Sequence, residues 1–181
     1  RFVSQLEQIE PATLSSDGRI NRAMLLRELR VNRSEYEDGL HLIALDMRSG
    51  PQHWHSMVEY LPMETEQDHL DWLTRLRNLP EQLAQYQALL TEGLDKGRTQ
   101  AQIVMSRVPS QIQSLLEGDA SDSPFFRAFT ALPEHLDAVQ RETLREEARQ
   151  VIDEYINPAF DELMTFLVEH YLPAARAPGI G

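Results

Sequence analysis

The sequence predicts an all-α fold, an irregular assembly of about six to eight helices. Apolar residues recur at helical spacing along nearly the whole chain, and strict alternation of apolar and polar residues is nearly missing. Glycine is sparse, with 8 among 181 residues, and most of the 10 prolines stand where one apolar stripe ends and the next begins. The length suits a single helical domain or fragment over 1–181, and the polar turn cluster at 118–124 is the candidate for an internal hinge.

The first helices are predicted from the residues that end helices or form turns. Residues 1–10 are expected to form a short helix that Pro11 closes. A turn at 15–18 precedes a long helix from about Asn21, and the sequence does not decide whether this helix breaks near Gly39.

Two short segments follow this long helix. The apolar run 40–45 is too short for periodicity to separate helix from strand, and we favour helix because no neighbouring segment offers a strand to pair with. Residues 51–64 follow a clear breaker and are expected to be a loop with at most one helical turn.

The middle helices are predicted from their first turns. Thr65-x-x-Asp68 resembles a capping box with aspartate in place of the usual glutamate. Pro80 is expected at the first position of a second helix, because proline is favoured there. Thr99-x-x-Gln102 predicts a third helix that runs to about residue 116 and bends at Pro109.

The last third is expected to hold the longest regular helix, over about 133–156. Asn157-Pro158 should interrupt it, and a final helix should end at Leu172-Pro173. We interpret the aromatic cluster at 125–129 as core. The outer face of the long helix carries opposite charges at helical spacing, which predicts a solvated face; the pairs are Asp137–Arg141, Glu142–Arg145 and Glu146–Arg149.

Composition excludes several classes of function. The 29 acidic and 17 basic residues give a formal net charge of −12, and no basic face of the kind that binds nucleic acid is evident. The absence of cysteine excludes disulfide scaffolds, thiolate zinc sites and cysteine nucleophiles. No apolar run approaches the ~18 residues needed to span a membrane.

One cluster has the composition of a metal site, namely His53-x-His55 with Glu59. Side chains two residues apart converge in a strand or irregular loop but not in a helix, so we interpret this cluster as two solvated histidines. No two histidines are four residues apart, which excludes His-Glu-x-x-His in this sequence. Glu134-His135, Glu169-His170 and the paired carboxylates are interpreted as surface. The residues themselves therefore predict no catalytic group and no metal ligand.

An ordered series of motifs resembles a large bacterial family, the domain of unknown function 885, over about residues 40–181. The match rests on the order of the motifs, because none is diagnostic alone. They are Tyr60-Leu-Pro-Met-Glu-Thr, Asp71-Trp-Leu-Thr-Arg-Leu, Leu79-Pro80, Gly93-x-x-x-Gly97, Ser123-Pro-Phe-Phe, Asn157-Pro-Ala-Phe-x-x-Leu, and Tyr171-Leu-Pro-Ala-Ala-Arg with Gly179 three residues on.

The resemblance implies a mainly helical protein several hundred residues long, similar to zinc-dependent metallopeptidases, with its zinc motif downstream of the tyrosine–proline–arginine segment. The chain opens at Arg1 and the family pattern stops near Gly179, so we expect the helical N-terminal part alone. No zinc ligand or general base of the family can be placed on these residues. Zinc is expected in the full-length protein and no cofactor in this chain.

The expected role is a non-catalytic wall and support for a substrate cleft, with the C-terminal catalytic half of the same protein and a peptide substrate as partners. Tyr171 and Arg176 are the candidate substrate-binding residues, since they lie where that half would begin. The simpler interpretation is a tyrosine capping the core and an arginine paired with an acidic neighbour. The alternative role is a self-contained helical binding or scaffold module without activity. Members of the family include exported and cytosolic proteins, so the compartment stays open.

Overall fold

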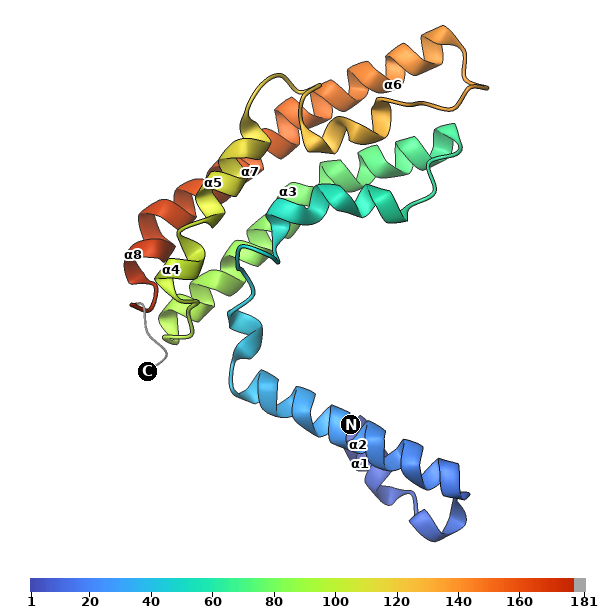
Figure 1. The fold of residues 1–181 in the computed structure, drawn as a ribbon, viewed down its shortest axis with the longest axis vertical. Coiled ribbons are helices and arrows are strands. Elements are labelled where there is room, and N and C mark those ends of the chain that lie inside the picture. Colours follow the sequence, from blue (N-terminus) through green and yellow to red (C-terminus); the bar gives the residue numbers. More distant parts are fainter. Residues whose placement is uncertain (178–181) are drawn as a thin grey trace. The chain divides into compact units, whose positions relative to one another are not determined.

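The computed structural model describes residues 1–177, which fall into two compact units that divide between Ile43 and Ala44 (Figure 1). Gly179, the last residue of the closing motif, lies outside the described residues. The described chain contains helices and no strand, apart from one isolated bridge between Ala101 and Arg176. The prediction of an all-α fold with about six to eight helices is confirmed.

The first unit is a helical hairpin, and its elements are α1 (Phe2–Gln8), η1 (Pro11–Thr13), α2 (Ser16–Glu37) and η2 (Leu40–Leu42). The two helices are joined through Arg22, whose Nε donates to the Leu6 carbonyl over 2.8 Å, and through an ion pair of 2.7 Å between Arg30 and Glu7. Only Leu26 of α2 is buried. The hairpin therefore has almost no core of its own.

The boundaries of α2 correct the predicted start at Asn21. The helix begins five residues earlier because the Ser15 side chain accepts a hydrogen bond from the Gly18 amide and caps the first turn. It ends at Glu37, and Gly39 follows with a φ of 76°, a left-handed conformation that glycine adopts readily. The run 40–45 holds one 3-10 turn, which is a shorter element than the expected helix.

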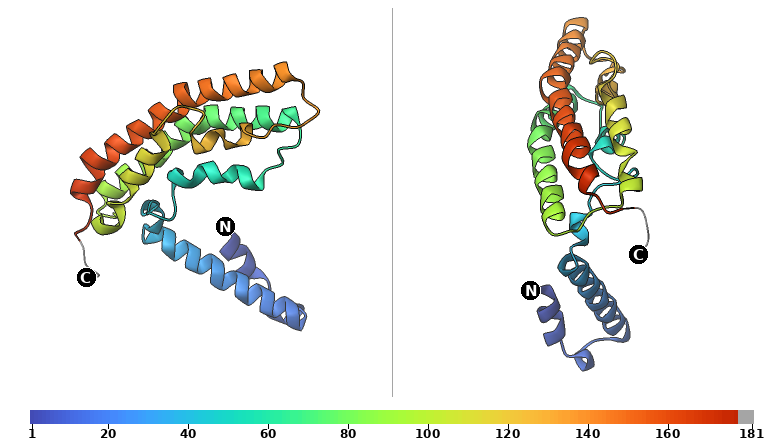
Figure 2. Two further views of the ribbon diagram at one scale, coloured as in Figure 1. Left: turned by 45° about the horizontal axis from the view of Figure 1, so that its top comes forward. Right: turned by 90° about the vertical axis from the view of Figure 1, so that its left-hand side faces the viewer.

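The second unit is built around two long helical runs that lie side by side and point the same way (Figure 2). Near their starts the Gln140 amide donates to Glu66, and near their ends Tyr171 bonds to the backbone of Gln100. Shorter segments return along these runs. The elements are η3 (Pro51–Tyr60), α3 (Glu66–Asp95), α4 (Gln102–Met105), α5 (Val108–Leu116), η4 (Pro124–Phe129), α6 (Ala138–Val151), η5 (Ile152–Ile156), α7 (Asn157–Phe166), η6 (Leu167–Tyr171) and α8 (Leu172–Ala174).

The predicted start of a new helix at Pro80 is wrong, since α3 runs unbroken from Glu66 to Asp95. A proline inside a helix removes one backbone hydrogen bond and costs about 3 kcal/mol. Leu76, Leu79 and Leu83 continue one buried face across the proline, and each buried leucine contributes about 2 kcal/mol. Burial along this face outweighs the local penalty. The predicted Thr65–Asp68 capping box is confirmed.

The single bent helix predicted after Thr99 is also wrong. Thr99 caps no helix, because its hydroxyl accepts a hydrogen bond of 3.0 Å from the Arg176 amide. The chain instead forms the short α4 and then α5, with Pro109 in the first turn of α5. Proline is tolerated there because the first turn needs no amide donor. Residues 51–64, expected to be mostly loop, contain the ten-residue 3-10 segment η3.

The last long helix begins at Ala138 rather than at 133. Asp137 forms a capping box with Gln140, so its carboxylate is not paired with Arg141, whose guanidinium donates to the Glu134 carbonyl. The predicted Glu142–Arg145 and Glu146–Arg149 pairs are present, at 3.9 and 2.6 Å.

The helix also passes both predicted breaks at proline. Ile152–Ile156 and Leu167–Tyr171 are π-helical segments, and each ends two residues before a proline, Pro158 or Pro173. In a π-helix the amide bonds to the carbonyl five residues back instead of four. The wider turn shifts the bonding pattern next to a residue that has no amide donor, so the chain stays helical through α7 into α8.

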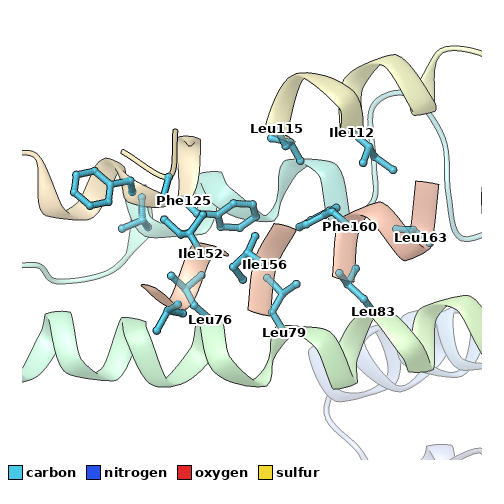
Figure 3. Packing of buried hydrophobic residues seen from close by; sticks show 14 of the residues in the cluster. Leu76, Leu79, Leu83, Ile112, Leu115, Phe125, Ile152, Ile156, Phe160 and Leu163 are labelled. Carbon is cyan, nitrogen blue, oxygen red and sulfur yellow. The ribbon is translucent and has the colours of Figure 1, made fainter. Parts of the chain in front are cut away.

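The core of the second unit lies between the two long runs and the returning segments (Figure 3). Leucines of α3 face Ile152, Ile156 and Phe160, while Ile112 and Leu115 of α5 cover the opposite side. Phe125, Phe126 and Phe129 of η4 are all buried, which confirms their interpretation as core. None of the helices within 1–177 is both long enough and apolar enough to cross a membrane.

Candidate functional site

The two predicted site residues lie at one junction, where the end of the last helical run meets the segment after α3. The Tyr171 side chain is fully buried, and its hydroxyl accepts a hydrogen bond of 2.9 Å from the Gln100 amide. Arg176 joins the same segment through its backbone: its amide donates to Thr99, and its carbonyl accepts from the Gln102 amide over 2.9 Å. The Arg176 side chain is exposed. The structure thus brings the two residues to one segment, but the Tyr171 side chain lies in the core and the Arg176 side chain is exposed to solvent.

Two phenols lie in this part of the unit, the buried Tyr171 and the partly buried Tyr86. Burial raises the pKa of Tyr171, and the hydrogen bond from the Gln100 amide partly opposes this shift. Burial also raises the pKa of Tyr86 to about 12, and its hydroxyl donates to the Ala44 carbonyl. Both phenols are therefore neutral hydrogen-bonding groups around neutral pH, and each one fixes a backbone segment to the helical core.

The histidines of η3 do not converge with Glu59. A ring nitrogen of His53 lies 3.2 Å from the Met47 carbonyl, and His55 packs edge-on against the Phe125 ring. Glu59 instead pairs with Arg127 over 2.6 Å. Burial, followed by the nearby His53, lowers the pKa of His55. These three residues do not fit a shared metal ion, and among residues 1–177 no three His, Cys, Asp or Glu side chains gather closely enough to hold one.

The other candidate pairs are two carboxylates, or a carboxylate and a histidine, that are adjacent in sequence. The two side chains of such a pair do not share a partner. Glu146 bonds Arg149, whereas Glu147 bonds Arg77 across to α3. His135 and His170 are exposed. No nucleophile–base pair is therefore formed by these residues.

A broad open groove of about 790 Å³ runs between α3 and α6. Its apolar part is formed by Ala138, Val139 and Thr143, and the Val139 side chain is 74% exposed. Charged residues border it, including Arg77 from α3 and three glutamates from α6. The remaining lining residues are Glu142, Glu146, Glu147 and Gln150. The groove offers an extended surface that could accept a segment with apolar and basic side chains.

A second hollow, of about 310 Å³, lies in the first unit between α1 and α2. It is almost entirely apolar, and Phe2, Ile9 and Leu25 are its exposed large side chains. Gln5, Leu6 and Leu29 complete its lining.

Sequence reasoning missed both hollows and one buried histidine, His69. The charge pairs of α6 are typical of exposed helices, so they predict a solvated face and give no indication of a groove. His69 stands three and four residues before the buried Trp72 and Leu73, and this spacing places it on the inward face of α3. The spacing was therefore the available signal for its burial.

Within residues 1–177, the helices present an open groove beside α6 and an apolar hollow in the first unit. The family model for the bacterial protein of unknown function DUF885 matches residues 1–181. The chain therefore belongs to this family, and the match extends over the first unit, beyond the resemblance expected for about 40–181. Comparison with curated proteins and with solved structures found no match.

Proposed function

We propose that this chain is the non-catalytic helical portion of a zinc-dependent bacterial peptidase, forming a cleft wall and support for a catalytic half. The observation that carries this proposal is the open groove between α3 and α6, bordered by two long helices whose inner faces are firmly packed. A rigid pair of helices can hold one side of a peptide channel. The proposal assigns no zinc ligand to any residue of this chain.

The polarity of the groove supports a peptide ligand. Thr143 and the exposed Val139 offer apolar contact to side chains of an extended peptide, while Glu142 and Glu146 offer acceptors for amide or basic groups. Glu147 is held by Arg77, which keeps it in place between the two helices. We accordingly propose a preference for peptides that carry basic residues.

Arg176 and Tyr171 have different parts in this proposal. The exposed Arg176 guanidinium is free of the backbone contacts that hold its amide and carbonyl, so it can reach a substrate carboxylate or an acidic group of the catalytic half. Tyr171 is a positioning residue, because its hydroxyl holds the Gln100 segment against which Arg176 docks.

The proposal is tested on the protein expressed from its whole gene. We expect that protein to contain zinc by elemental analysis and to cleave a library of basic peptides, and Val139→Arg to lower kcat/KM by filling the groove. Val168→Arg is the matched control, because Val168 is also an exposed valine on the last helical run but lies outside the groove. A metal-free protein without peptidase activity would contradict the proposal.

The alternative is a helical binding or scaffold module without activity, and the apolar hollow of the first unit favours it. An amphipathic partner helix could bury the exposed apolar side chains of this hollow, which are Phe2, Ile9 and Leu25. The gene sequence beyond Gly181 separates the two functions. A stop codon there supports the module, whereas a helix with a His-Glu-x-x-His-like motif supports the enzyme.

A further inference from the structure

His69 is a buried titratable residue that the proposed function does not use. Its side chain is fully buried on α3, next to the ring of Phe129. Its Nδ1 lies 2.9 Å from the carbonyl oxygen of Thr65, and its Nε2 lies 3.1 Å from the carbonyl oxygen of Ala128. Both ring nitrogens therefore face oxygens that can only accept hydrogen bonds.

A neutral imidazole cannot satisfy this arrangement. It carries one N–H donor and one unprotonated nitrogen, whichever tautomer it adopts. The unprotonated nitrogen would direct its lone pair at a carbonyl oxygen in a buried site, which is unfavourable. Only the imidazolium ion donates to both Thr65 and Ala128. Turning the ring over would replace both N–O contacts by C–H contacts.

The bond to Ala128 is one of three that hold η4 to the long helices. The indole Nε1 of Trp72 donates to the Phe125 carbonyl over 3.5 Å, and Nε of Arg145 donates to the Phe129 carbonyl over 3.2 Å. Indole and guanidinium groups keep their N–H donors at every physiological pH. Within this set only an imidazole can change its number of N–H donors by gaining or losing one proton.

The charged and titratable groups around this contact have partners of their own. Asp68 accepts from Thr65, and Glu66 accepts from Gln140. Hydrogen bonds from Thr65 and, to a lesser degree, the nearby His69 lower the pKa of Asp68. Arg127 of η4 pairs with Glu59, and His55 of η3 packs on the Phe125 ring. The side chains concerned, from every element at this contact, are Glu66 and Asp68 on α3, Arg127 on η4, Arg145 on α6, and His55 and Glu59 on η3.

We propose that His69 is a pH-sensitive clamp that ties η4 to the first turns of α3 when it is protonated. Loss of one proton removes one of its two hydrogen bonds. The contribution of His69 to the stability of η4 is therefore greatest at low pH and falls as the pH rises.

The first test needs no variant. In protein with ¹⁵N-labelled histidine, NMR should show both ring nitrogens of His69 protonated at about pH 5.5 and one proton lost as the pH is raised toward about 8.5. Over the same range the hydrogen-exchange protection factors of the η4 amides, which are corrected for intrinsic exchange, should fall at least about tenfold. A neutral ring at pH 5.5, a ring that never titrates, or titration without loss of protection would each overturn the proposal.

A second test compares His69→Gln with His135→Gln, a control at an exposed histidine of the same unit. The pH-dependent loss of η4 protection should vanish in H69Q and persist in H135Q. His55 is unchanged in both variants, so any effect of its own titration is common to both and cancels in the comparison. An unchanged pH dependence in H69Q would overturn the clamp, and the NMR titration of the unaltered protein decides the matter if H69Q does not fold.

Discussion

At the residue scale, several buried or partly buried polar side chains of the second unit bind backbone groups. Tyr86 donates to the Ala44 carbonyl, Tyr171 accepts from the Gln100 amide, and the buried Gln52 donates to the Asp46 carbonyl over 2.7 Å. Each of these bonds joins a helix or turn to a segment without regular structure. Single side chains therefore fix the loops where backbone ladders are absent.

Tyr171→Phe should remove the acceptor for the Gln100 amide without changing the shape of the core. Because a buried donor is left without a partner, we expect the free energy of unfolding to fall by about 1–3 kcal/mol in urea titrations. Tyr155→Phe, at a more exposed tyrosine of the same helical run, is the control and should change stability little. An equal effect of the two substitutions would contradict the role assigned to the Tyr171 hydroxyl.

The raised pKa of Tyr86, about 12, predicts a loss of stability in alkali. The unfolded chain releases this proton near the ordinary tyrosine pKa of 10.0, whereas the folded chain holds it, so the stability that Tyr86 contributes is lost as the pH rises from about 10 to 12. Urea unfolding at about pH 9 and pH 11 should show a smaller loss in Tyr86→Phe than in the unaltered protein. An identical loss in both would contradict this account.

At the scale of elements, prolines show how the surroundings decide where a helix stops. Pro80 lies inside α3, Pro109 begins α5, and Pro158 follows a π-helical segment. The local penalty differs between them, because Pro80 removes a hydrogen bond inside a helix, whereas Pro109 lies in a first turn that needs no amide donor. Continuous burial along one face keeps α3 helical through Pro80, and a π-helical segment precedes Pro158 in a run that stays helical.

Pro80→Ala should stabilise the protein, because it restores an amide donor in the middle of α3. We expect an increase of about 2 kcal/mol in the free energy of unfolding, measured in urea. Pro133→Ala, which lies in the loop before α6, should give no comparable gain. A loss of stability in P80A would show that α3 requires the distortion that proline introduces.

The class of fold and the Thr65–Asp68 capping box could be predicted from the sequence. Asp68 behaves as its local pattern indicates, because its hydrogen bonds reach only to Thr65 and Glu64. The aromatic cluster of η4 is buried as its apolar composition indicates, although its rings pack on distant residues such as Phe160. Thr99 shows the limit: its pattern matches a capping box, but its hydroxyl binds Arg176, which is distant in sequence. Contacts of this kind depend on the tertiary structure, and no single-sequence pattern encodes them.

The π-helical segments have a signal in the sequence, which is the four-residue spacing of the apolar residues. Ala148, Ile152, Ile156 and Phe160 are buried at intervals of four residues. In a regular α-helix each such step drifts by about 40° from the buried face. A wider turn corrects the drift, so repeated four-residue spacing before a proline favours a π-helical segment. The groove between α3 and α6 had no such signal, because it requires two helices to be placed side by side.

At the scale of the whole molecule, the two units differ in what they bury. Leu26 and Leu42 are the buried large apolar side chains of residues 1–43, whereas the second unit has an extended core. A chain of about 40 residues rarely folds alone without such a core. The first unit therefore has less stability of its own than the second.

Residues 44–181 expressed alone should stay folded, with helical circular dichroism and cooperative unfolding. A peptide of residues 1–43 should show little stable helix in water, because its two helices bury too little apolar surface. Loss of cooperative unfolding in the 44–181 fragment, or a stably folded 1–43 peptide, would contradict this division.

The pairing of each π-helical segment with a proline also has a consequence for how related sequences evolve. A π-turn corresponds to a one-residue insertion in an α-helix, and two such insertions lie fifteen residues apart in this chain. Relatives that lack proline at 158 or 173 have less need of the extra residue. Their genes should then carry a single-codon deletion just upstream, which leaves the buried residues on either side in register.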